Sequence, residues 1–137
     1  MDVTSLADAS ALVDFLIGNM SSSLDRKEFH KSLIYAPDLI INEAISALTR
    51  LWRNGTIPNS LYRETLEDLT TIPTKIISSR SLIKSMPPKL GHISAYDAAY
   101  VCLAENLQIP FYTTDAKLSK AAQKYCQVNL IKRKIDY

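Results

Sequence analysis

Apolar and polar positions along the chain follow two patterns, short apolar runs and longer segments with helical spacing. Short runs predict strands at residues 3–7, which are rather polar, and at 33–35, 74–78, 110–113 and 128–131. Helical spacing predicts helices at residues 11–18, 23–30, 38–54, 59–69, 95–104 and 116–125, with a short helical start at 80–84. Strands that alternate with helices are typical of an α/β fold with a mainly parallel sheet. We therefore expect a central sheet flanked by helices.

The segment from Ala95 to Ala104 is apolar or aromatic at every position except Asp97. Such a segment predicts a helix that is buried on all sides. A carboxylate on a buried helix needs a partner, because an unpaired buried charge is costly. One partner is local, since Ser94 followed three residues later by Asp97 matches a capping box. The other interpretation is that Asp97 belongs to a functional site.

Three further carboxylates have positions that favour a shared site. Asp8 and Asp115 each follow a predicted strand and precede a helix, and Glu43 borders the apolar stripe of the helix at 38–54. Each also has a simple local explanation: the two aspartates can be N-caps, and Glu43 can be a solvated edge residue. All of them belong to the rim of the sheet where strands end and helices begin, which is where parallel sheets bind ligands. Carboxylates gathered there would repel one another unless a cation lay between them.

This acidic group favours a hard divalent cation. Mg²⁺ or Mn²⁺ takes carboxylate and water oxygens, whereas zinc is disfavoured because no His or Cys cluster accompanies the acids. Bound cations of this kind suit hydrolysis of a phosphodiester. The hydroxyls expected to support metal-bound waters or phosphate belong to Ser10, Thr113 and Thr114. The cations expected to bind substrate phosphates, with a solvated basic face as the alternative, are Arg50, Arg53, Lys117 and Lys120.

The composition of the chain indicates its domain number and its cellular location. The 137 residues suit one domain over 1–137, with 47% hydrophobic residues and a net charge of +2. The basic excess is concentrated at Lys132–Lys134, which is compatible with nucleic acid. No apolar run approaches ~18 residues and the first ten residues do not resemble a signal peptide, so we expect no membrane span and a cytoplasmic location. Two cysteines without a CxxC pair fit a reducing compartment.

Two other ionisable side chains have no evident partner in the sequence pattern. Asp14, inside the first predicted helix, is expected to be solvated, and His30 is expected at the surface.

Three segments resemble successive motifs of PIN-domain ribonucleases, and within these the VapC type, the toxin of a toxin–antitoxin pair. They are DASALVDFL from Asp8, APDLIINEAISALTRL from Ala36, and SAYDAAYVCLAENLQIPFYTTDAKLSKAA from Ser94. The resemblance implies a Mg²⁺-dependent endoribonuclease whose acidic site consists of Asp8, Glu43, Asp97 and Asp115. It also implies a five-stranded sheet in the order 3-2-1-4-5, a homodimer, and a VapB-like antitoxin that blocks the site. The chain departs from the family at its rather polar first strand and at Pro87–Pro88, which interrupts a region that is usually helical.

Two alternatives follow from the same residues. The first is a PIN-like module that binds RNA or a protein without cutting, although all four acidic positions are present. The second is a phospho-acceptor receiver domain, which is also a small parallel α/β fold. A receiver would need paired acids after the first strand and an acceptor Asp after the third. The third predicted strand is instead followed by Ser79 and Arg80.

Overall fold

Five strands form one parallel sheet in the computed structural model, which describes residues 3–137. The strands are β1 (Val3–Ala7), β2 (Ser32–Pro37), β3 (Thr74–Ile77), β4 (Phe111–Thr113) and β5 (Val128–Leu130). Their order across the sheet is β3-β2-β1-β4-β5, and every neighbouring pair is parallel. The predicted α/β class and the predicted strand order are confirmed. Met1 and Asp2 lie outside the described residues.

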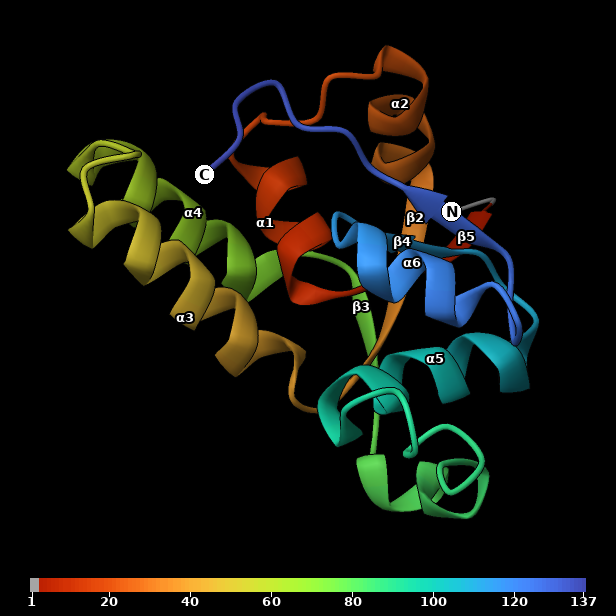
Figure 1. Ribbon diagram of the computed structural model, residues 1–137. Helices are drawn as coiled ribbons and strands as arrows, with labels where there is room; N and C mark the ends of the chain where they lie inside the picture. Colours follow the sequence, from red (N-terminus) through yellow and green to blue (C-terminus); the bar gives the residue numbers. More distant parts are fainter. Residues whose placement is uncertain (1–2) are drawn as a thin grey trace.

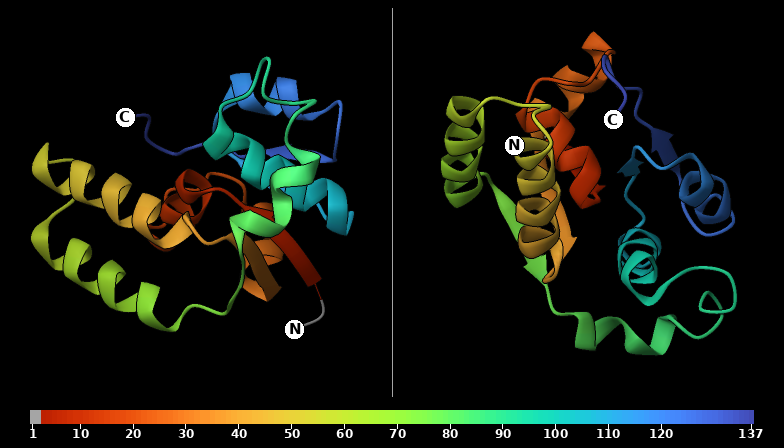
Figure 2. Two further views of the ribbon diagram at one scale, coloured as in Figure 1. Left: turned by 90° about the horizontal axis from the view of Figure 1, so that it is seen from below. Right: turned by 60° about the vertical axis from the view of Figure 1, so that its left-hand side comes forward.

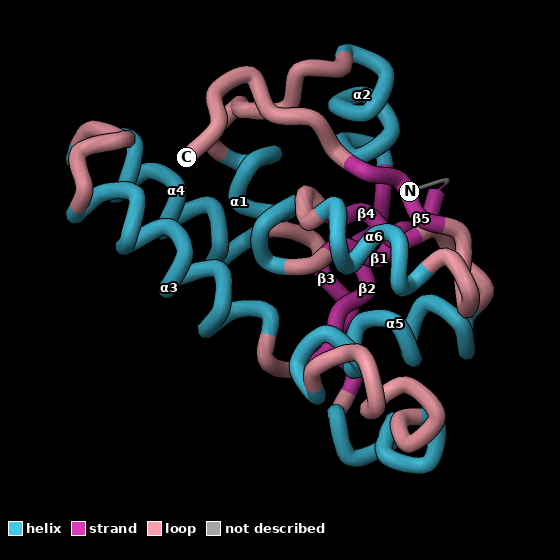
Figure 3. The backbone as a smooth tube through the Cα atoms, viewed as in Figure 1, coloured by secondary structure: helices cyan, strands magenta, loops and turns pink. Residues whose placement is uncertain are grey.

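Helices flank this sheet (Figure 3). They are α1 (Ala9–Leu16), α2 (Ser23–Lys31), α3 (Ile40–Arg53), α4 (Asn59–Thr71), the 3₁₀ helix η1 (Ser79–Ser85), α5 (Ala95–Leu107) and α6 (Ala116–Ala122). Helices α3 and α4 lie side by side as a hairpin that extends away from the sheet (Figures 1 and 2). Within residues 3–137, no helix combines the length and the apolar character needed to cross a bilayer.

The helix boundaries differ from the predicted ones where a cap or a turn decides them. The first helix starts at Ala9 because Asp8 caps it, accepting a hydrogen bond from the Ala11 N–H. The third begins at Ile40 rather than at residue 38, after a turn. The sixth ends at Ala122, and the chain continues in turns through residue 125. The predicted helical start at 80–84 is the 3₁₀ helix η1.

Helix α5 is the buried helix that the apolar run predicted. Every residue from Ala98 to Ala104 is buried, and the helix packs against β1, β2 and β4. Ser94 caps its N-terminus by accepting a hydrogen bond from the Asp97 N–H at 3.1 Å. Its C-terminus ends at Gln108, whose φ of 54° is left-handed and stops the helix. Each fully buried Leu, Val or aromatic side chain of this core contributes about 1.5–3 kcal/mol.

A buried lysine fixes the segment that carries Pro87 and Pro88. Lys89 is only 3% exposed, and its ammonium forms an ion pair with Glu105 of α5 at 2.8 Å. The same ammonium donates a hydrogen bond to the Ser85 carbonyl at 2.9 Å. The prolines therefore end the helical region after η1, and Lys89 holds the following turn against α5.

The strand order places the topological switch point between β1 and β4. From β1 the chain proceeds to β2 and β3 on one side of the sheet, and later to β4 and β5 on the other. Ala7 pairs with Tyr112, so Asp8 and Thr113 lie next to each other beyond the carboxyl ends of their strands. Ligands of open parallel sheets bind at such a point. The flavodoxin-like order 2-1-3-4-5 is not the order found here, which removes the main support for a receiver domain.

Candidate active site

The four predicted carboxylates line one open pocket of about 390 Å³ at the switch point. Asp8 follows β1, Asp115 follows β4, Asp97 lies in the first turn of α5, and Glu43 lies in the first turn of α3. Four separate elements thus bring acids from distant parts of the chain to the same rim of the sheet. Their catalytic and metal-binding roles stay predictions.

Asp8 is held by hydrogen bonds on both carboxylate oxygens. Oδ1 accepts from the Ser10 hydroxyl at 2.8 Å and from the Ala11 N–H at 3.0 Å. Oδ2 accepts from the hydroxyl of Thr113, which in turn accepts from the Asp115 N–H at 3.1 Å. Ser10 and Thr113, predicted as supporting hydroxyls, therefore contact Asp8 directly. A carboxylate bound on both oxygens has one fixed orientation.

Burial raises the pKa of Asp8 to about 6 from its ordinary 3.8. The hydrogen bonds from Thr113, Ala11 and Ser10 act in the opposite direction, and the nearby charge of Asp97 adds to the rise. The fold therefore carries an ionised Asp8 near neutral pH at a free-energy cost.

Replacing Asp8 with Asn is expected to stabilise the metal-free fold in a pH-dependent way. Because the pKa is higher in the folded state, stability is full below 3.8 and is lost as pH rises through about 6. Asp8→Asn removes this loss, so the free energy of unfolding of the variant minus that of the wild type should grow by roughly 2–3 kcal/mol between pH 3.8 and neutral pH. Urea denaturation in EDTA at several pH values measures the difference. A gap that does not shrink as pH falls toward 3.8 would contradict the assignment.

Asp97 and Asp115 combine helix capping with a place in the pocket. The Ser94 hydroxyl accepts from the backbone N–H of Asp97, so the Asp97 carboxylate is not needed for that cap. Partial burial raises the pKa of Asp97, the Ser94 hydroxyl lowers it, and the charge of Asp115 raises it again. Asp115 caps α6 through one oxygen, which accepts from the Leu118 N–H at 3.0 Å. The capping and site interpretations are therefore compatible.

Glu43 has a partner that the sequence analysis did not identify. The hydroxyl of Tyr100, whose residue is 1% exposed, donates a hydrogen bond to Glu43 Oε1 at 2.6 Å. Burial, with the Glu43 hydrogen bond and charge in addition, raises the pKa of Tyr100, so this hydroxyl stays a donor. Tyr100 lies three residues after Asp97, on the same face of α5. That spacing is the signal that could have identified it.

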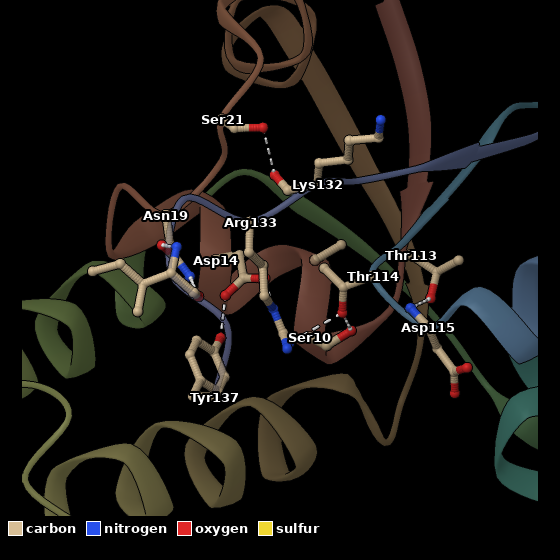
Figure 4. A network of polar contacts seen from close by, with 12 residues as sticks. Ser10, Asp14, Asn19, Ser21, Thr113, Thr114, Asp115, Lys132, Arg133 and Tyr137 are labelled. Carbon is tan, nitrogen blue, oxygen red and sulfur yellow. Dashed lines mark hydrogen bonds and ion pairs between the residues drawn. The ribbon is translucent and has the colours of Figure 1, made fainter.

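The expectation that Asp14 is solvated is wrong. Its side chain is fully buried and forms an ion pair with Arg133, whose Nε lies 2.6 Å from Asp14 Oδ2. The hydroxyl of Tyr137 also donates a hydrogen bond to Asp14 (Figure 4). Burial acts to lower the pKa of Arg133, but hydrogen bonding and charge from Asp14 outweigh it and raise that pKa. The partners come from the last residues of the chain, which local periodicity cannot reveal.

The four predicted cations occupy different positions around the acidic pocket. Arg50 lines the acidic pocket, and Lys117 lines an adjoining one together with Asp97 and Asp115. Arg53 and Arg50 line a neighbouring groove along α3. Lys120 is exposed on α6. Arg133, which the sequence analysis did not name as a site residue, also lines the acidic pocket.

The donor set has the chemistry that a magnesium site requires. Carboxylate and hydroxyl oxygens are the ligands that Mg²⁺ and Mn²⁺ prefer, and the mutual repulsion of these acids favours a cation among them. Within residues 3–137, no three side chains of the Asp, Glu, His or Cys type already converge as a complete ligand set.

The fold and the acidic pocket define a PIN-like protein, and comparison with known proteins agrees. The chain is 31% identical to Ribonuclease VapC1 of Mycobacterium tuberculosis over 129 residues, which cover 93% of this chain and 97% of that one. It is 31% identical to Ribonuclease VapC3 of the same species over 85% of each chain. No protein-family model matches it. The chain belongs to the VapC ribonuclease family.

Solved structures show the same fold. A crystal structure of PAE2754 from Pyrobaculum aerophilum has a TM-score of 0.63 and 24% identity, covering 92% of this chain and 83% of that one. VapBC2 of Rickettsia felis, crystallised with a promoter DNA fragment, has a TM-score of 0.60 and 11% identity, covering 95% of this chain and 100% of that one.

Proposed function

We propose that this protein is a Mg²⁺-dependent endoribonuclease, with Mn²⁺ as an alternative cation, and the toxin of a toxin–antitoxin pair. The observation that carries the proposal is the convergence of four carboxylates at the switch point in a member of the VapC family. Ribonuclease is the name of the curated relatives, and their sequences match this chain over most of its length.

The proposed roles follow from the contacts. Asp8, Glu43, Asp97 and Asp115 hold the cation. The Ser10 hydroxyl contacts Asp8 and the Thr114 hydroxyl contacts Ser10, and their oxygens can accept hydrogen bonds from metal-bound water. A bound Mg²⁺ would supply a water of lowered pKa and offset charge on the leaving oxygen. Tyr100 holds Glu43 from the core side, and Thr113 and Ser10 fix Asp8.

Arg50 is proposed to bind a substrate phosphate at the pocket and Arg53 to bind the next along α3. Replacing Arg50 with Met is expected to weaken binding of single-stranded RNA and to reduce the slope of log K against log salt by about 0.7, the value of one phosphate contact. Binding titrations in EDTA at several salt concentrations measure both quantities. Arg63→Met, an exposed arginine on α4, is the matched control. Equal slopes in the two variants would show that Arg50 does not contact a phosphate of the RNA.

Cleavage of a mixed RNA pool tests the proposed function. Purified protein is incubated with Mg²⁺, with Mn²⁺ and with EDTA, and the products are mapped. Discrete internal cuts that require the cation support an endoribonuclease. RNA binding that persists in EDTA, with no product under any condition, supports the alternative of a binding module that does not cut.

The proposed partners are a VapB-like antitoxin, a second copy of this chain in a homodimer, and the RNA substrate, all in the cytoplasm. A solved VapBC complex with this fold supports the antitoxin. The antitoxin is proposed to cover the acidic pocket, so addition of the cognate antitoxin should stop cleavage.

A further inference from the structure

Residues 131–137, named the C-terminal segment here, return to the start of the chain and are fixed beside α1 (Figure 1). The Ser21 N–H donates to the Lys132 carbonyl at 3.0 Å, and the Lys134 N–H donates to the Asn19 carbonyl at 2.8 Å. The Asn19 side chain binds the backbone of Ile135 on both its N–H and its carbonyl. The segment is therefore attached through its backbone, independently of the side chain of Arg133.

Asp14 and Tyr137 hold the guanidinium of Arg133 in place. Its Nε binds fully buried Asp14 at 2.6 Å, and its guanidinium lies 4.1 Å from the ring centre of Tyr137. The Arg133 side chain is only 18% exposed. Because Asp14 offsets the positive charge, what Arg133 presents to the acidic pocket is mainly a set of N–H groups with fixed direction.

A chain of hydrogen bonds leads from Arg133 to Asp8. Nη2 of Arg133 donates to the Thr114 hydroxyl at 3.1 Å, and that hydroxyl donates to Ser10 Oγ at 2.8 Å (Figure 4). Ser10 donates to Asp8 Oδ1 at 2.8 Å. A guanidinium has donors and no acceptor, so the Thr114 hydroxyl accepts from Arg133 and is free to donate its hydrogen to Ser10. All bonds in the chain then point toward Asp8, and each one polarises the next.

We propose that Arg133 is a positioning residue of the active site, which acts through Thr114 and Ser10 to orient Asp8 for the cation. This inference rests on the proposed function. It assigns a role to the buried ion pair of Asp14 and Arg133, which the catalytic carboxylates alone do not explain. It also makes the C-terminal segment a part of the site.

The test interrupts the hydrogen-bond chain between Arg133 and Asp8 at two places, using variants of the full-length protein. The paired variant Asp14→Leu with Arg133→Met replaces the ion pair by apolar side chains, which avoids leaving a buried carboxylate unpaired. Thr114→Val removes the relay hydroxyl and leaves the ion pair in place. Lys134→Met, an exposed neighbour of Arg133, is the matched control. Circular dichroism and thermal melting report whether each variant is folded.

Mn²⁺ titration calorimetry without RNA is the first readout, and RNA cleavage is the second. We expect both end variants to bind Mn²⁺ about 10-fold more weakly than wild type, the size expected for loss of a group that orients a metal ligand. Combining them should give no further loss, because both cut the same chain of bonds. Lys134→Met should match wild type.

Three outcomes would overturn the proposal: wild-type Mn²⁺ affinity in both end variants, multiplying losses in the combined variant, or a wild type that binds no Mn²⁺. A lowered melting temperature with unchanged Mn²⁺ affinity would reduce Arg133 to a structural role. A wild type that binds Mn²⁺ but does not cut RNA would refute the proposed function alone, since the comparison of Mn²⁺ affinities still decides the role of Arg133.

Discussion

Replacing Asp97 with Asn is expected to lower metal-dependent RNA cleavage by more than about 100-fold, because loss of groups that only orient a metal ligand already costs 10–100-fold. The charge of Asp97 raises the pKa of Asp8, and the charge of Asp115 raises the pKa of Asp97, so Asp97 interacts with both of the other aspartates. An amide at this position keeps the shape of the side chain and removes the charge that holds a cation. Initial rates of cleavage at saturating Mg²⁺ measure the effect.

The fold should survive this change, which makes the loss of activity interpretable. The cap of α5 uses the backbone N–H of Asp97 and not its carboxylate. RNA binding in EDTA should persist or strengthen, because one negative charge leaves the pocket. Asp68→Asn on α4, away from the pocket, is the control for an Asp-to-Asn change. Cleavage at the wild-type rate in the Asp97 variant would exclude this carboxylate from the site.

Replacing Arg133 alone with Met is expected to produce the largest loss of stability. The change leaves Asp14 buried without its cation, and breaking a buried ion pair in this way costs about 3–5 kcal/mol. For a domain of this size the melting temperature should fall on the order of 10 °C. Urea and thermal denaturation near neutral pH measure both quantities.

The paired variant Asp14→Leu with Arg133→Met separates the lost charge pair from lost packing. Apolar replacement of both partners is often neutral or stabilising, so the double variant should recover most of the stability lost in the single one. If the single and double variants melt at the same temperature, the cost comes from packing of the long Arg133 side chain against Tyr137 and not from an unpaired Asp14.

Local pattern was sufficient for much of the fold. Alternation of apolar runs and helical spacing located the strands and helices, and the apolar run from Ala95 to Ala104 identified the buried helix α5. The strand order came from resemblance to a family, because periodicity does not determine which strands become neighbours. The rule that ligands bind where strands end brought Asp8 and Asp115 into one hypothesis with Asp97, and the pocket contains all of them.

The sequence pattern could not predict which side chains far apart in the chain contact each other. Asp14 occupies one position of an amphipathic helix, and its partner Arg133 lies 119 residues away in a segment that returns over α1. Tyr100 could only be a core aromatic by pattern, because its hydrogen bond to Glu43 joins residues 57 apart. Where a polar side chain is buried, its partner depends on the three-dimensional path of the chain.

Because the network joins the two ends of the chain, its residues leave the ribosome at very different times during synthesis. Asp8, Ser10 and Asp14 leave the ribosome first, whereas their partners Thr114 and Arg133 follow about a hundred residues later. At roughly 10 residues per second, about ten seconds separate the two ends of the network. The nascent chain therefore carries an incomplete acidic pocket during most of its synthesis, and the hydrogen-bond chain from Arg133 to Asp8 can form only after Arg133 has left the ribosome.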